Sequence, residues 1–158
     1  LPLRATVVAG PLLADDAFTA LQRALHDDAR CRLLRSTDAM PALLASADLV
    51  VGMGGYNTVY ESLAAGAPLL VLPRRHPREE QWERCRRLAA RGLLRLLDAQ
   101  QLGDPHALAN ALRLALTDGV LTPPAPLPCA GADVAARVCL RLSRERAAPR
   151  TTFARFGN

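Results

Sequence analysis

The stretch VVGMGGYNTVYESLAAGAPLLVLP, residues 50–73, decides the fold of this chain. Two apolar runs flank a glycine-rich segment and a helical one, an order typical of a strand, a tight turn, a helix and a second strand. The first run, 48–53, is short and apolar, so we expect a strand that is covered on both faces. The helix is expected to begin near Asn57 and to end at Gly66, before a strand at 68–73.

The same alternation of strand and helix continues on both sides of this stretch. The expected strands cover 4–10, 31–35, 48–53, 68–73 and 93–97. The expected helices cover 15–28, 37–47, 57–66, 78–92, 104–118 and 132–147. Thr37 or Asp38 is expected to cap the second helix, and Asp104 to open the fifth. Because right-handed crossovers leave few other arrangements, we predict an α/β fold with a parallel sheet of five or six strands and helices on both faces.

Length and cysteine content fit one ordinary domain. The chain has 158 residues, enough to bury a core without disulfides or a metal. We assign 1–146 to this domain and expect 147–158 to form a flexible tail. The four cysteines are Cys31, Cys85, Cys129 and Cys139, and no two of them form a C-x-x-C pair. We therefore expect reduced thiols in a cytoplasmic protein.

The net charge of +5 arises from 20 basic residues, all arginine, against 15 acidic ones. Aromatic residues make up only 4% of the chain and the arginines are dispersed, so we expect no nucleic-acid binding. No run reaches the about 20 apolar residues that span a bilayer, although peripheral contact with a membrane stays open. The chain begins with Leu1 instead of methionine, and we expect it to be a piece of a longer protein.

The glycine-rich segment has the composition of an anion site. Gly54 and Gly55 follow the third expected strand, and Asn57 and Thr58 begin the next helix, whose unpaired N–H groups would suit a diphosphate. Glu61 lies one turn further along, where a carboxylate would repel phosphate but accept hydrogen bonds from ribose hydroxyls. On these residues alone a structural role stays open, in which the glycines only turn the chain.

Two familiar nucleotide-binding and signalling patterns fit poorly. A dinucleotide fingerprint would place its third glycine where Asn57 stands, and it would follow the first strand. A response-regulator receiver would need an aspartate at the end of the third strand, where this chain has Gly52 and Met53. We set both patterns aside.

The segment MGGYNTVYESLAAGAPLLVLPRRHPREEQ, 53–81, resembles the nucleotide-sugar-binding region of GT-B glycosyltransferases, in particular the C-terminal domain shared with the peptidoglycan N-acetylglucosaminyltransferases. It is also similar to the plant secondary-product signature, H-C-G-W-N-S-x-x-E followed by G-x-P and a distal glutamine. The matching residues are Gly55, Tyr56, Asn57, Thr58, Glu61, Gly66, Pro68 and Gln81. The resemblance implies the Rossmann-like C-terminal half of a GT-B fold, with the N-terminal acceptor domain absent from this chain.

By this resemblance the chain binds a nucleotide-diphosphate sugar, with UDP as the expected nucleotide. The expected substrate-binding residues are Gly10, Thr37, Gly54, Gly55, Tyr56, Asn57, Thr58, Glu61, Arg74, His76, Glu80 and Gln81. Gly54 to Thr58 and Gly10 would meet the diphosphate, Glu61 the ribose, and Glu80 and Gln81 the sugar hydroxyls, while the base would be read near Thr37. Met53 replaces the phosphate-contacting histidine of the plant signature, so Arg74 or Arg75 would supply that charge.

The resemblance implies transfer of a sugar to an acceptor hydroxyl. No metal or other cofactor is expected, and the chain contains no Asp-x-Asp triplet. The catalytic base is expected in the missing half, so this fragment alone should be inactive. Two alternatives stay open: a nucleotide-sugar 2-epimerase of the same architecture, and a non-catalytic nucleotide-binding subunit that contacts its partner through the polar helix 78–92.

Overall fold

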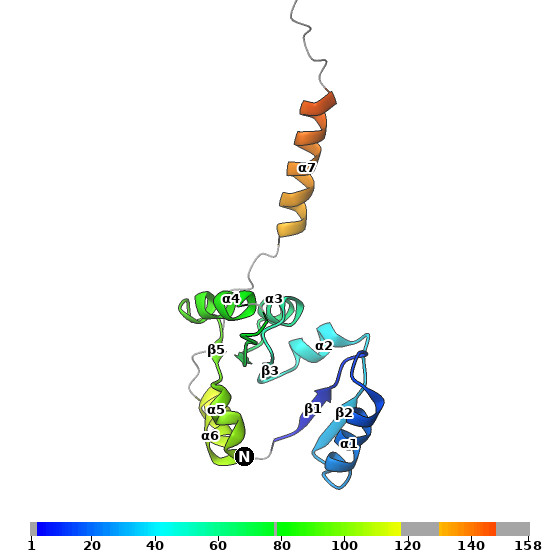
Figure 1. Ribbon diagram of the computed structural model, residues 1–158, viewed down its shortest axis with the longest axis vertical. Helices are drawn as coiled ribbons and strands as arrows, with labels where there is room; N and C mark the ends of the chain where they lie inside the picture. The colour runs from blue at the N-terminus through cyan, green and yellow to red at the C-terminus, as the bar shows by residue number, and fades with distance from the viewer. Residues whose placement is uncertain (1–2, 78, 118–129, 148–158) are drawn as a thin grey trace, which may run out of the picture. The chain divides into compact units, whose positions relative to one another are not determined.

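The computed structural model describes residues 3–77, 79–117 and 130–147 (Figure 1). Its strands are β1 (Ala5–Val8), β2 (Cys31–Leu34), β3 (Val50–Gly52), β4 (Leu69–Val71) and β5 (Arg95–Leu96). Its helices are α1 (Asp15–Leu25), α2 (Met40–Ala45), α3 (Tyr56–Ala65), α4 (Glu80–Ala89), α5 (Ala99–Gly103), α6 (Pro105–Thr117) and α7 (Gly131–Ala147). The predicted alternation of strands and helices is confirmed, with one additional helix, α5.

Two helix starts differ from the prediction. Helix α5 is opened by Asp98, whose carboxylate accepts from Gln100 N at 3.1 Å while Gln101 Oε1 accepts from Asp98 N at 2.9 Å. This is a capping box, and the sequence D-A-Q-Q contained its signal. Helix α2 begins after Ala39, so neither Thr37 nor Asp38 is its N-cap. Thr37 Oγ1 instead accepts from Ala39 N, before the helix starts.

The strands are parallel, as predicted, but they pair as two sheets instead of one. Strand β1 pairs with β2, and β4 lies between β3 and β5. Ala5 and Thr6 of β1 are exposed, and Val51 of β3 is 52% exposed, so the expectation that 48–53 is covered on both faces is wrong. Apolar runs predict where strands form, but strand neighbours depend on contacts between segments distant in sequence.

The core is centred on β4. Leu69, Leu70 and Val71 are each at most 1% exposed, and because alternate residues of a strand point to opposite faces, both faces of β4 are covered. On one face Leu70 packs with Leu97 and Ala115, against which further apolar side chains of α6 are packed. Helices α3 and α4 also contribute buried side chains, namely Val59, Leu63, Cys85 and Leu88. The burial of the sheet β3–β4–β5 is therefore concentrated on its central strand, β4.

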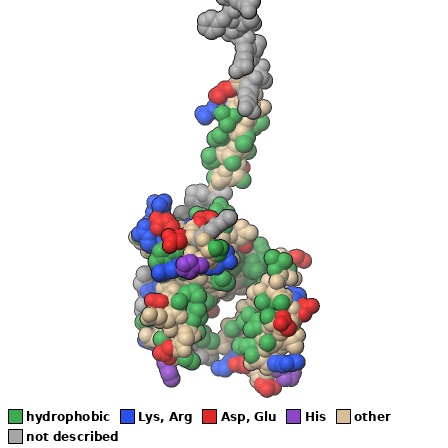
Figure 2. Space-filling model, viewed as in Figure 1, with side chains coloured by type: hydrophobic (Ala, Val, Ile, Leu, Met, Phe, Trp, Pro, Cys, Tyr) green, Lys and Arg blue, Asp and Glu red, His purple; other side chains and the backbone are tan. Residues whose placement is uncertain are grey.

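Helix α7 belongs to a second unit, Leu127–Asn158, which is described by itself. Its exposed apolar side chains include Val134, Val138, Leu140 and Leu142. Figure 2 shows apolar side chains along this helix. No helix within the described ranges combines the length and apolar character needed to cross a bilayer. All but the first residue of the predicted tail lie outside the described residues, and the domain boundary at 146 stays a prediction.

No disulfide joins the cysteines that the structure describes. Cys31, Cys85 and Cys139 are free thiols, and Cys129 lies outside the described residues. Cys85 is completely buried within the first unit, Leu1–Pro126. Its position against the glycine turn is part of the candidate site.

Candidate functional site

A glycine turn leads from β3 into α3. Gly54 has a φ of +73°, a left-handed conformation that favours glycine. Gly55 is the N-cap of α3 with a φ of −59°, and a Cβ atom there would meet nothing within 4 Å. Gly54 is thus required by the backbone, whereas Gly55 leaves open space beside the start of the helix.

The N-terminus of α3 has free hydrogen-bond donors. Gly55 has no side chain to cap the helix, and the amides of Tyr56, Asn57 and Thr58 meet no acceptor among the described residues. By contrast, Asp98 caps α5, and Asp104 accepts from the first turn of α6. Three unpaired amides at the positive end of a ten-residue helix form a natural place for an anion.

Side chains of the first turns of α3 differ in their surroundings. Asn57 and Glu61, four residues apart on the helix, are both exposed, and Glu61 forms no hydrogen bond or ion pair with a described residue. Thr58 is half-buried: its methyl group lies 3.2 Å from where a Cβ of Gly52 would be, and its carbonyl accepts from Ser62 Oγ at 2.6 Å. Thr58 therefore packs against the strand end, while Asn57 and Glu61 remain accessible to a ligand.

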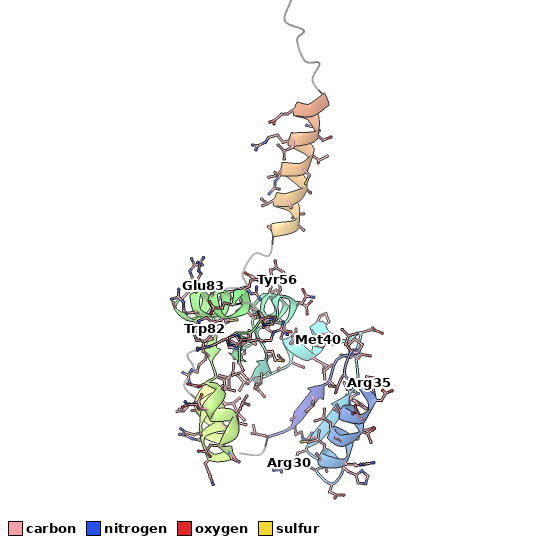
Figure 3. All side chains as sticks on the ribbon, in the orientation of Figure 1. Arg30, Arg35, Met40, Tyr56, Trp82 and Glu83 are labelled. Atoms are coloured by element: carbon pink, nitrogen blue, oxygen red, sulfur yellow. The ribbon has the colours of Figure 1, made fainter. Side chains whose placement is uncertain are left out.

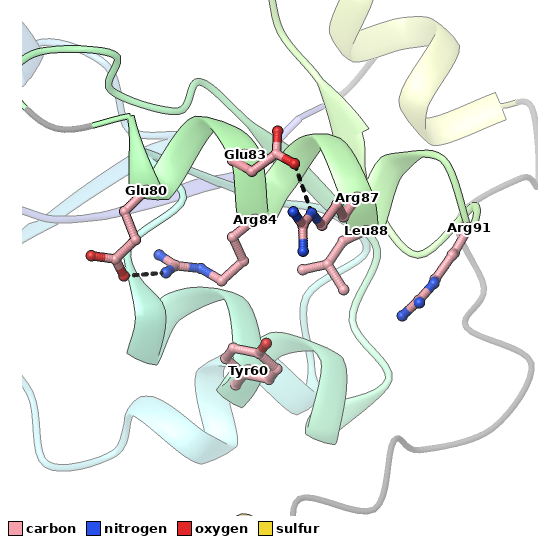
Figure 4. A pocket seen from close by; sticks show the side chains of 7 residues that line it. All are labelled: Tyr60, Glu80, Glu83, Arg84, Arg87, Leu88 and Arg91. Atoms are coloured by element: carbon pink, nitrogen blue, oxygen red, sulfur yellow. Dashed lines mark hydrogen bonds and ion pairs between the residues drawn. The ribbon is translucent and has the colours of Figure 1, made fainter.

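Helix α4 holds the glycine turn through Arg84. Arg84 Nη2 donates to the Gly54 carbonyl at 3.1 Å, and Nη1 pairs with Glu80 Oε1 at 2.8 Å (Figure 4). The guanidinium also lies 5.6 Å from the ring centroid of Tyr56, the first residue of α3. Gln81, beside Glu80, is half-buried, and its Oε1 is buried with no hydrogen-bond partner among the described residues.

Cys85, the next residue of α4, also packs against Gly54. A Cβ atom at Gly54 would lie 2.8 Å from Cys85 Sγ, and burial raises the pKa of this thiol, which keeps it neutral. Sequence reasoning missed both Arg84 and Cys85. The Glu80–Arg84 spacing on α4 was visible, but the contact with Gly54, 30 residues earlier in the chain, was not.

Gly10 follows β1 and Thr37 follows β2, the two strands of the other sheet. Gly10 N donates to the Arg35 carbonyl at 2.9 Å, so this amide is already used and could not serve a phosphate. Arg35, which is labelled in Figure 3, fixes the loop further. It pairs with Asp15 at 2.8 Å and its guanidinium carbon lies 4.1 Å from the Phe18 ring centroid. The predicted second phosphate contact therefore lacks its amide donor.

The carboxyl ends of β3, β4 and β5 line an open groove of about 940 Å³. Met53, 60% exposed, lies in this groove with Arg74 and Arg75. Arg75 lies 3.8 Å from the ring centroid of Trp82. Neither arginine pairs with an acidic side chain among the described residues. Asp98 also lines the groove, so its two arginines outnumber one carboxylate and the groove is cationic.

The predicted site residues do not all meet in one cavity. Arg74 lines the cationic groove, whereas Glu80 lines a separate cavity of about 380 Å³ between α3 and α4 (Figure 4). Glu61 and His76 line neither of these two cavities, although both are exposed. Within the described ranges no group of three His, Cys, Asp or Glu side chains could hold a metal ion.

Comparison with known families decides what this architecture is. Residues 15–121 match the model of the glycosyltransferase family 28 C-terminal domain. The chain belongs to this family. Over 98 residues it is 37% identical to the UDP-N-acetylglucosamine--N-acetylmuramyl-(pentapeptide) pyrophosphoryl-undecaprenol N-acetylglucosamine transferase of Rhodospirillum centenum (strain ATCC 51521 / SW). This match covers 61% of the chain but only 24% of that transferase.

Solved structures show the same fold for this family 28 domain. The calicheamicin glycosyltransferase CalG4 superposes with a TM-score of 0.56 and 20% identity, covering 94% of this chain and 46% of that protein. The glycotransferase of kitacinnamycin gives a TM-score of 0.54 and 18% identity, covering 89% of this chain and 42% of that protein. The chain thus spans less than half the length of each, and the predicted Rossmann-like half of a GT-B fold is confirmed.

Proposed function

We propose that this chain is the donor-binding domain of a glycosyltransferase that moves a sugar from a UDP-sugar to an acceptor hydroxyl. The observation that carries the proposal is the uncapped N-terminus of α3, placed at the carboxyl end of β3 with the exposed Glu61 one turn away. Membership of family 28 supports a nucleotide-sugar donor. The name of the Rhodospirillum relative, which includes UDP-N-acetylglucosamine, supports UDP as the nucleotide.

The diphosphate would bind against the start of α3. The free amides of Tyr56, Asn57 and Thr58 would donate to its oxygens, and the open space beside Gly55 would let a phosphate approach the backbone closely. Arg74 and Arg75 share the groove with Met53, the position at which the plant signature has a histidine. These arginines would supply the positive charge that Met53 cannot.

Carboxylates and an amide would bind the remaining hydroxyls of the donor. Glu61, with no partner among the described residues, would accept hydrogen bonds from the ribose. Glu80 keeps one carboxylate oxygen on Arg84 and has an exposed side chain, so its other oxygen could accept from the sugar. Gln81 Oε1, buried and unpaired among the described residues, would gain the donor that it lacks.

In transfer, the acceptor oxygen would attack the anomeric carbon while the bond from that carbon to the β-phosphate oxygen breaks. UDP would leave with the electron pair, and the amides of α3 would stabilise its growing negative charge. A base in an N-terminal half, outside this chain, would take the acceptor proton. We expect no metal to be needed, because the helix terminus and the arginines supply positive charge, and UDP affinity should be unchanged by a chelator.

Calorimetric titration of the 158-residue chain with UDP, GDP, dTDP and UDP-N-acetylglucosamine tests the proposal. We expect a preference for UDP, and a loss of about tenfold or more in affinity for Glu61→Ala, since hydrogen bonds to a charged group are worth about 1.5–3 kcal/mol. Asp48→Ala is the matched control, because it removes an exposed carboxylate at the opposite, amino end of β3. A folded chain that binds no nucleotide, or equal losses in the two variants, would contradict the proposal.

A further inference from the structure

Arg84 differs from the neighbouring arginines of α4. Figure 2 shows side chains of both charges gathered over this helix, and Arg86 and Arg87, paired with Glu83, have side chains that are 55% and 71% exposed. The Arg84 side chain is only 14% exposed. Its Nε is buried with no hydrogen-bond partner among the described residues, a costly state for a cation. An ordinary surface ion pair would not require this burial.

The contacts of Arg84 reach two parts of the proposed donor site at once. One terminal nitrogen holds Glu80, which is expected to bind sugar hydroxyls, and the other holds the carbonyl of Gly54, one residue before the N-cap of α3. A guanidinium is planar and rigid, so it fixes the distance between the two groups that it binds. A lysine has all its donors on one nitrogen, so it would not hold the two groups at this separation.

We propose that Arg84 is a positioning residue that couples recognition of the sugar to recognition of the diphosphate. This inference rests on the donor site proposed above. By holding the Gly54 carbonyl, Arg84 keeps the amides at the start of α3 directed at the diphosphate. By holding Glu80, the same guanidinium aligns the carboxylate for the sugar, so each half of the donor is bound best when the other is in place.

Titration of the Arg84→Met chain with UMP, UDP and UDP-N-acetylglucosamine tests the coupling. Methionine fills similar space without hydrogen bonds, and we expect UDP affinity to fall about tenfold while UMP affinity changes less than about twofold, because the outer phosphate loses its aligned amides. Glu80→Gln should weaken UDP-N-acetylglucosamine in the wild-type chain but add little in the Arg84→Met background. Arg86→Met, which removes an exposed arginine of the same helix that does not line the cavity of Glu80, is the control and should leave all three affinities unchanged.

A ligand-free measurement keeps the inference testable by a second route. Amide hydrogen exchange at Val59, whose N–H donates to the Gly55 carbonyl at 3.0 Å, should be faster in Arg84→Lys than in the wild-type chain, with the thermal midpoint nearly unchanged. Unchanged UDP affinity in Arg84→Met, an equal loss for UMP and UDP, or unchanged exchange in Arg84→Lys would overturn the positioning role. Failure of the wild-type chain to bind UDP would overturn the donor site itself, and this inference with it.

Discussion

A Cβ atom on Gly54 would lie 2.8 Å from Cys85 Sγ, closer than packed atoms approach. The same atom would lie 3.5 Å from Cα and Cβ of Pro73, which follows β4. The turn after β3 is therefore enclosed by α4 and by the end of the neighbouring strand. This contact brings the glycine turn against residues that lie 19 and 31 positions further along the chain, so the start of α3 is held by the core.

Alanine substitutions at the two glycines should separate stability from binding. Gly54→Ala should lower the free energy of unfolding by about 1–3 kcal/mol, because it combines a left-handed φ with a steric clash. Gly55→Ala should cost at most about 1 kcal/mol, since its Cβ meets nothing and alanine is only a poorer N-cap than glycine, yet weaken UDP binding by filling the space beside the diphosphate. Urea denaturation and calorimetry on both variants would measure the two effects.

A double variant separates the steric clash with Cys85 from the left-handed φ of Gly54. Gly54→Ala with Cys85→Ala removes the sulfur atom from the clash but leaves the left-handed φ, so it should recover only part of the loss expected from adding the two single changes. Full additivity would show that Cys85 is not the obstacle. Unchanged UDP affinity in Gly55→Ala would show that the ligand does not approach this backbone closely.

Much of the fold around the glycine turn could be predicted because its signals are local. The apolar positions Val59 and Leu63 repeat at helical spacing, and both are completely buried in α3. Gly66 ends this helix with a φ of +71°, as a left-handed C-cap does. Apolar runs between turn signals likewise predicted the strands, since a strand that is buried on both faces, such as β4, has an apolar residue at every position.

The features that were missed depend on contacts between distant segments. Nothing in the run 4–10 indicates that β1 pairs only with β2, and no local signal joins Arg84 to Gly54. Packing also decides which way each predicted site residue points. The place of Thr58 on the helix could be predicted, but the packing of its methyl group against Gly52 could not. The predicted set of site residues was read from a linear motif, which cannot show that Arg74 and Glu80 line different cavities.

The paired carboxylate of Glu83 should make stability fall in acid. Hydrogen bonds from Arg86 and Arg87 lower its pKa from 4.5 to about 2. The stabilisation is therefore fully present above pH 4.5 and is lost as the pH falls through about 2, where the folded state also takes up the proton. Urea unfolding of the wild-type chain and Glu83→Gln from pH 7 to 2 should show a difference that disappears at the acid end.

The matched control for this pH dependence is Glu79→Gln. Glu79 precedes α4 and makes no side-chain ion pair within the described ranges. Its substitution should therefore change stability little across the same pH range. A difference between Glu83→Gln and the wild-type chain that stays constant down to pH 2 would show that the two arginines do not lower the pKa of Glu83.

Met53→His tests whether a bound diphosphate lies beside Met53, the position at which the plant signature has a histidine. Met53 is exposed beside Arg74, so a histidine there has room to reach a bound diphosphate without disturbing the core. Histidine has an ordinary pKa of about 6.5, so the added positive charge is present at pH 5.5 and absent at pH 8. We expect UDP affinity to rise severalfold over wild type at the lower pH and to match it at the higher. Met53→Gln adds a polar side chain without charge, and a gain shared by both variants at both pH values would show that charge at this position does not matter.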